Sequence, residues 1–133
     1  MSFINNNLKI VSFIKFELGC KCPDEVFESI ELVENFHNGN SLTVKLIVGN
    51  KLMVVFIRNE NFEYTQQEVL NHLHNRIKER DRQGLNRVRV VFAIPDDADT
   101  LNIQKKYTDI DIDEKAHVHF INSSKLDIIL AMS

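Results

Sequence analysis

The sequence predicts an α/β protein, an α+β sandwich in which a mixed sheet packs against amphipathic helices. Three observations support this fold class: apolar runs of strand length, a hairpin turn at Gly49-Asn50, and a helix-capping sequence that begins at Thr65. The predicted elements form a βαββαβ-like core, the order of a ferredoxin-like sandwich, with a C-terminal α-β-α extension.

Length and composition place the whole chain in one domain. The 133 residues are 44% hydrophobic and 26% charged, which is ordinary for a globular domain that folds without disulfides. A net charge of −3 gives no general attraction to nucleic acid or to an anionic membrane. No apolar run reaches the roughly 18 residues that span a bilayer, and Asn5-Asn6-Asn7 stand where a secretory signal would be basic. We therefore expect a soluble, cytoplasmic protein with a single domain over residues 1–133.

The N-terminal third allows two interpretations. Residues 8–16 carry apolar side chains on both alternating faces, which predicts a strand covered on both sides. Pro23 suits the first turn of a helix, and apolar residues at helical spacing predict that this helix continues to the His37-Asn38-Gly39 segment. In the alternative, the helix ends by Glu28 and residues 30–36 form a strand.

The centre of the chain gives clearer signals. Residues 42–48 and 52–57 predict two strands of a hairpin, joined by a two-residue turn of type II′ at Gly49-Asn50. Thr65 and Glu68 form a capping box, in which each side chain satisfies a backbone donor at the start of a helix.

The C-terminal half continues with alternating helices and strands. Gly84 can close the helix that Thr65 begins, and residues 88–94 form a strand that Pro95 ends. Beyond it we expect a short helix over residues 99–107, a strand over residues 117–121 and a closing helix. Residues 109–113 alternate like an edge strand or form an acidic loop, and Ser124 caps the closing helix.

Cys20-Lys21-Cys22 is the first candidate site. Thiols near a helix N-terminus and a lysine have a lowered pKa, and a bridge between residues this close is strained and easily reduced. The pair could therefore serve as a redox switch or as a thiol-dependent oxidoreductase in which one thiol attacks and the other resolves. The strand, turn, Cys-Pro and helix layout resembles the active-site corner of thioredoxin-like proteins, which however use Cys-x-x-Cys. The alternative is two small residues that fill a turn.

A zinc site is the second candidate. Cys20 and Cys22 with His117 and His119 would supply the two thiolates and two imidazoles that zinc accepts in a tetrahedron. Alternation along a strand places both histidines on one face, but the site requires that the two segments meet. The alternative is two surface histidines on a sheet.

The remaining polar clusters are expected in solvent. His72 and His74 lie on nearly opposite sides of the predicted helix. A basic stretch consists of Arg76, Lys78, Arg80, Arg82, Arg87 and Arg89. Acidic residues lie between these cations, and no aromatic residues alternate with them, so we do not expect a nucleic-acid partner.

A strand over residues 30–36 would give the order αβββαβ, which resembles the core of restriction-endonuclease-like nucleases. Those enzymes hold a metal through an acid on one strand and an acid-x-Lys on the next. Lys45 has Thr43 two residues before it, where the acid should stand. The chain is therefore at most a degenerate nuclease-like domain.

We conclude from the sequence that this is a small soluble binding or interaction module. We expect the protein to bind another protein or a second copy of itself. Cys20 and Cys22 are the residues that could respond to thiol state or to metal. A thiol-dependent oxidoreductase is the alternative, and zinc is the one cofactor that the residues suggest.

Overall fold

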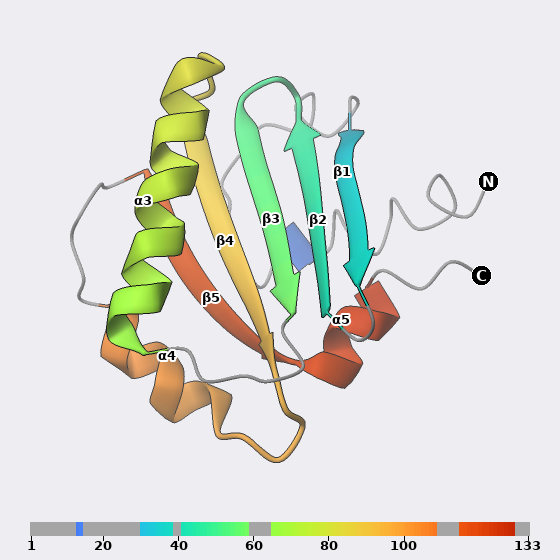
Figure 1. The fold of residues 1–133 in the computed structure, drawn as a ribbon, viewed down its shortest axis with the longest axis vertical. Coiled ribbons are helices and arrows are strands. Elements are labelled where there is room, and N and C mark those ends of the chain that lie inside the picture. The colour runs from blue at the N-terminus through green and yellow to red at the C-terminus, as the bar shows by residue number, and fades with distance from the viewer. Residues whose placement is uncertain (1–12, 15–29, 39–40, 59–64, 109–114, 130–133) are drawn as a thin grey trace.

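The protein is built on a five-stranded mixed sheet with the strand order β1-β2-β3-β4-β5 (Figure 1). The computed structural model describes residues 13–14, 30–38, 41–58, 65–108 and 115–129. Strands β1 to β3 are antiparallel neighbours, and β3 to β5 run parallel. The predicted α/β class and mixed sheet are therefore confirmed. The elements are β1 (Ile30–Asn38), β2 (Ser41–Val48), β3 (Leu52–Arg58), α3 (Gln66–Arg82), β4 (Arg87–Ile94), α4 (Thr100–Thr108), β5 (Ala116–Asn122) and α5 (Ser123–Ile129).

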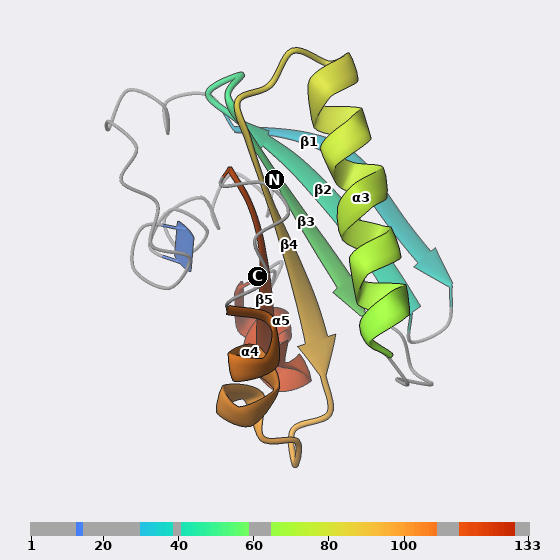
Figure 2. The same cartoon turned by 90° about the vertical axis from the view of Figure 1, so that its left-hand side faces the viewer.

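Both faces of the sheet are packed, which explains why β3 and β4 are almost continuously apolar (Figure 2). On one face, strand residues such as Val55 and Phe92 pack with side chains of α3 and α4. On the opposite face, Phe56 packs with Phe13 at a ring-centroid distance of 5.8 Å, and α5 adds further apolar side chains. The sheet therefore has two separate hydrophobic cores. None of the helices in the described part of the chain has the length and apolar character needed to cross a bilayer.

Residues 30–38 form strand β1. The helix that was predicted to continue through them is therefore wrong there, and the alternative prediction of a strand is correct. The pairing of β1 with β2 shifts between Leu32 and Glu34, so that Val33 is an extra residue in a bulge. Because the bulge interrupts the period-two alternation, the apolar residues of β1 take on a spacing that resembles a helix.

Other N-terminal predictions lie outside the described residues, including Cys20, Cys22 and the start of the helix at Pro23. Of the predicted strand over residues 8–16, only Phe13 and Ile14 are described. They lie in a helical turn and are almost completely buried, at 3% and 0% exposure. Their apolar character therefore reflects burial in the core rather than pairing in the sheet.

The hairpin between β2 and β3 is confirmed, with a correction to its turn. Gly49 and Asn50 have φ values of 61° and 57°. Positive φ at both central residues fits a type I′ turn, not the predicted type II′ turn. Strand pairing resumes at Val48 and Leu52, so the connection also includes Lys51.

Helix α3 begins and ends where the sequence predicts. The Thr65 side chain accepts a hydrogen bond from the Glu68 backbone N–H at 3.2 Å. At the other end Gly84 has φ +70°, and Leu85 N–H donates to the Arg80 carbonyl at 2.9 Å. These two features define a Schellman motif, which needs a left-handed residue and so favours glycine.

The C-terminal α-β-α extension is also confirmed as α4, β5 and α5. The Asp99 side chain accepts from the Asn102 backbone N–H at 3.1 Å and caps the start of α4. The predicted segment over residues 109–113 lies outside the described residues.

Candidate functional site

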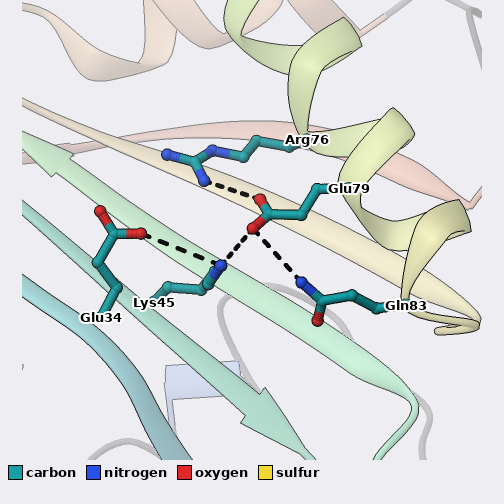
Figure 3. Close-up of polar contacts among 5 residues, drawn as sticks. All are labelled: Glu34, Lys45, Arg76, Glu79 and Gln83. Atoms are coloured by element: carbon teal, nitrogen blue, oxygen red, sulfur yellow. Dashed lines mark hydrogen bonds and ion pairs between the residues drawn. The ribbon is translucent and has the colours of Figure 1, made fainter.

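Lys45 is the centre of a charge network beneath α3 (Figure 3). Its side chain lies on the α3 face of β2, and the residue is only 6% exposed. The ammonium donates to Glu79 of α3 and lies 4.0 Å from Glu34 of β1. Arg76 donates to the second carboxylate oxygen of Glu79 at 2.8 Å, and Gln83 Nε2 lies 3.5 Å from the first. Strands β1 and β2 and helix α3 are therefore tied together through the Lys45 ammonium.

The network contains two cations and two carboxylates, so its formal charges balance. Burial alone would raise the pKa of Glu79, but the hydrogen bonds from Lys45 and Arg76 outweigh burial and lower it. A carboxylate that stays ionised and is held by two cations is a poor proton acceptor. We therefore interpret this network as a structural connection between helix and sheet.

The two central antiparallel strands bear on the nuclease resemblance. The described order β1-β2-β3-α3-β4 matches the βββαβ part of the nuclease-like core. However, neither β2 (Ser41–Val48) nor β3 (Leu52–Arg58) contains an aspartate or glutamate. Arg58 at the end of β3 pairs instead with Asp127 of α5 at 2.6 Å and with Ser123 at 3.1 Å. These strands thus cannot supply the carboxylates on which that class of metal-dependent hydrolysis relies.

A second polar cluster lies on β4 and β5, on the face opposite to α3. Arg89 is 8% exposed, and its Nη1 lies 3.3 Å from Nε2 of His119 on the neighbouring strand. Since a guanidinium can only donate, Nε2 of His119 must accept, and the proton of the neutral ring is on Nδ1. Burial first, and then the charges of Arg89 and His117, lower the pKa of His119 to about 4. His119 is therefore uncharged at neutral pH.

Arg89 keeps its charge without a carboxylate partner in the described part of the chain. Its Nε is also buried without a hydrogen-bond partner among the described residues. Burial, followed by the charge of Arg87, lowers the pKa of Arg89. The region around His119 therefore has a positive character that no described acid offsets.

A pocket of about 470 Å³ opens beside β5. Its wall combines residues of α4, β5 and α5 with Phe13 from the N-terminal segment. Apolar residues line part of it, and none of the described residues that line it is an aspartate or a glutamate. The polar lining residues are Thr100, Gln104, His117, His119, Asn122 and Lys125.

Only the histidine half of the predicted zinc site lies among the described residues. His117 and His119 point to the same face of β5, as predicted, with His117 exposed and His119 half-buried. Cys20 and Cys22 lie outside the described residues, so the four-ligand set stays a prediction. Among the residues that the structure describes, no three His, Cys, Asp or Glu side chains gather as metal ligands. The hydrogen bond from Arg89 occupies the lone pair of Nε2 of His119, and Nδ1 carries the proton, so His119 would have to give up that bond or that proton to bind zinc.

Three side chains expected in solvent are in fact buried or half-buried. Arg80 is 6% exposed and bonds Asp81 through Nε and Nη2, and Arg89 is buried as described above. His72 is half-buried and lies edge-on to Phe92 at a ring-centroid distance of 5.7 Å. Burial first, and then the charge of Arg76, lowers the pKa of His72. The predicted solvated surface is therefore wrong at these three positions.

The sequence interpretation missed the pocket and the pair of Arg89 with His119. One signal was present: Arg89 is the second residue of an otherwise apolar run, Val88 to Ile94, that is buried on both faces. A charged residue at such a position requires a polar partner on a neighbouring strand. The partner itself could not be identified without knowing that β4 lies beside β5.

Fold and site together define a mixed-sheet α/β domain with a pocket beside β5 at one sheet edge. No protein-family model, no curated protein and no solved structure matches this chain.

Proposed function

We propose that the protein is an interaction module that forms a homodimer by pairing β1 with β1 of a second copy. The observation that carries this proposal is the exposure of apolar side chains along β1. Leu32, Val33 and Phe36 are 37%, 44% and 57% exposed. Exposed apolar residues gathered on an edge strand are typical of an interaction surface rather than of a free monomer surface.

The contrast with the other edge of the sheet supports the choice of β1. At the β5 edge, the Gln104 side chain donates to the Val118 carbonyl at 2.8 Å and accepts from the Phe120 N–H at 2.9 Å. An amide side chain thus takes the position of a further strand. Among the described strands, β1 has β2 as its one neighbour and so stands at the edge of the sheet.

The side chains of β1 allow it to pair with β1 of a second copy without strong repulsion between like charges. In an antiparallel pairing centred on Phe36, the two phenyl rings meet at the twofold axis, and aromatic pairs stabilise association beyond their buried area. Glu34 and its counterpart would stand four residues apart along the strands, roughly 13 Å. That separation exceeds the screening length of about 8 Å at physiological salt, so repulsion between these carboxylates is weak.

The test is sedimentation velocity over a concentration series, comparing the wild-type chain with Phe36→Lys. The wild-type protein should move from monomer to dimer with concentration, and the variant should remain monomeric because a buried ammonium would replace the ring at the axis. Leu101→Lys is the matched control, since Leu101 is 75% exposed on α4, away from β1. A wild-type monomer at every concentration, or equal dissociation in both variants, would contradict the proposal.

Other parts of the sequence interpretation remain proposals. A cytoplasmic location belongs with this function, as does a response of Cys20 and Cys22 to thiol state or to zinc. For the rival oxidoreductase, the direct measurement is the pH dependence of thiol alkylation. A midpoint near the ordinary value of about 8.5 would argue against a reactive thiol.

A further inference from the structure

We propose that the pocket beside β5 binds an extended small molecule with a carbonyl-type acceptor at one end, a hydroxyl or N–H donor at the other and an apolar body between them. The inference does not depend on the proposed homodimer, because the pocket and β1 lie at opposite edges of the sheet. It rests on two polar side chains of the pocket wall, His119 and Asn122, each of which the protein holds in one hydrogen-bonding state.

His119 presents a donor to the pocket. The Arg89 guanidinium donates to Nε2, so the proton of the neutral ring is on Nδ1. Because a guanidinium keeps its proton and Arg89 is only 8% exposed, this tautomer is fixed from behind the ring. Nδ1–H has no hydrogen-bond partner among the described residues, and the side chain lines the pocket. The ligand group that meets His119 is therefore an acceptor.

Asn122 presents an acceptor. Its Nδ2 lies 3.2 Å from the carbonyl oxygen of Pro95 and 3.4 Å from those of Asp96 and Ala98. An amide oxygen in the place of Nδ2 would face three carbonyl oxygens, so the amide is held in one orientation. Its Oδ1 has no hydrogen-bond partner among the residues that the structure describes, and Asn122 lines the pocket. The ligand group that meets Asn122 is therefore a donor.

The spacing of these two residues indicates the length of the ligand. They are three residues apart on β5, so their Cα atoms are separated by roughly 10 Å. A single amide group is too short to meet both side chains, and the ligand has to be extended. Alternation along the strand places His119 and Asn122 on opposite faces, so the pocket follows the outer edge of β5, where Gln104 of α4 also lies.

The rest of the wall indicates the body of the ligand. Apolar surface comes from Phe13, Leu101, Phe120 and Ile121. Leu101 is 75% exposed, so an apolar body would remove apolar surface from water as it binds. A volume of about 470 Å³ is within the range of small-molecule sites, where apolar walls bind the body and a few polar groups orient it.

The experiment is calorimetric titration of the full chain with three probes. In para-hydroxyacetanilide a carbonyl acceptor and a hydroxyl donor stand at opposite ends of a benzene ring. In para-methoxyacetanilide the hydroxyl donor is methylated, and in para-isobutylphenol an apolar group of similar size replaces the acetamide. We expect para-hydroxyacetanilide to bind about fivefold more tightly than either analogue, because each analogue leaves one polar group of the wall unpaired.

The two analogues are more apolar than the first probe, so a wall that binds through apolar contact alone would prefer them. Tighter binding of the analogues, equal affinity for all three probes or binding of none would overturn the inference. This comparison uses the wild-type protein and does not depend on the folding of a variant.

Variants locate the binding. His119→Phe keeps a ring but removes the donor, and it should weaken para-hydroxyacetanilide about fivefold while leaving para-isobutylphenol, which has no carbonyl, unchanged. His119→Gln can accept from Arg89 and still donate, so it should restore part of the affinity. His74→Gln, at an exposed position of α3 outside the pocket lining, is the control and should bind as the wild type does. If His119→Phe leaves both affinities unchanged, or lowers both equally, the inference is wrong.

Discussion

His119 illustrates how a single residue changes character on folding. In the unfolded chain its imidazole has the ordinary pKa of 6.5, whereas in the folded protein burial and Arg89 lower that pKa to about 4. Protonation would take away the lone pair that accepts from Arg89 and place a second cation beside the guanidinium. The fold is therefore coupled to the neutral form of this side chain.

The coupling predicts a loss of stability in acid. Between about pH 6.5 and pH 4 the unfolded state binds a proton that the folded state does not, so the free energy of unfolding falls as pH falls through this window. The loss from His119 reaches about 3 kcal/mol at most, from roughly 1.4 kcal/mol for each pH unit between the two pKa values. Urea unfolding at pH 7.5 and at pH 4.5 measures it.

The comparison variant for this prediction is His119→Gln, which keeps a hydrogen-bonding side chain but does not titrate. Its stability should depend less on pH than that of the wild type, with a residual dependence from His72, whose pKa is lowered in the same direction. His74→Gln, an exposed histidine of α3, is the control and should behave as the wild type does. An unchanged pH dependence in His119→Gln would show that this residue is not the source.

At the scale of elements, the polar contact between α3 and the antiparallel half of the sheet is centred on one carboxylate. Glu79 receives hydrogen bonds from Lys45 of β2 and from Arg76 of its own helix. Lys45 is nearly buried, so an ammonium without its partner would be costly, whereas an apolar side chain at position 45 would have neighbours of its own kind. Loss of Glu79 and loss of Lys45 should therefore have different effects on the stability of the protein.

This asymmetry gives a prediction. Glu79→Gln should destabilise the protein by about 2–4 kcal/mol, because Lys45 would remain buried with only Glu34 at 4.0 Å. Lys45→Met should cost less than about 1 kcal/mol, since the buried charge is removed together with its desolvation penalty. Urea unfolding at neutral pH distinguishes the two.

The control is Glu68→Gln, an exposed carboxylate of the same helix, which should change stability by no more than about 0.5 kcal/mol. If Lys45→Met proves as damaging as Glu79→Gln, the network stabilises the fold through the lysine itself and the interpretation above is incorrect.

On the scale of the whole molecule, the two edge strands of the sheet differ in how their outer sides are covered. Gln104 covers β5 by bonding two of its backbone groups, whereas β1, at the other edge, has exposed apolar residues. An unprotected strand edge pairs with other chains, so covering one edge limits association to the other. A closed dimer, and not an extended fibre, is the consequence we expect.

Removing the cover should therefore open a second route of association. Gln104→Leu leaves the Val118 carbonyl and the Phe120 N–H without their partner, which should cost about 2 kcal/mol. Introduced together with Phe36→Lys, so that β1 cannot pair, it should restore concentration-dependent association. Light scattering and urea unfolding measure the two effects.

Asn102→Ala in the same Phe36→Lys background is the control, because Asn102 is exposed on α4 and its bond to Asp99 is made by its backbone N–H, which the substitution keeps. A double variant with Gln104→Leu that stays monomeric and fully stable would show that Gln104 does not protect the β5 edge.

The sequence alone determined the elements whose signals are local. The turn at Gly49-Asn50, the cap at Thr65, the stop at Gly84 and the strand that ends before Pro95 depend on backbone conformation and on hydrogen bonds between near neighbours. These interactions are complete within a few residues, so a reading of the sequence can recover them. The α/β class followed from the same elements.

Only the tertiary structure decided what depends on residues distant in sequence. The bulge at Val33 is a property of the pairing with β2, and it gave the apolar residues of β1 a spacing that favoured a helix over the alternative strand. Burial of Arg89 and the low pKa of His119 require β4 and β5 to lie side by side, and the cover on β5 requires α4 to lie along its edge. Burial and electrostatics are set by the neighbours that folding supplies, and no local pattern encodes which neighbours those will be.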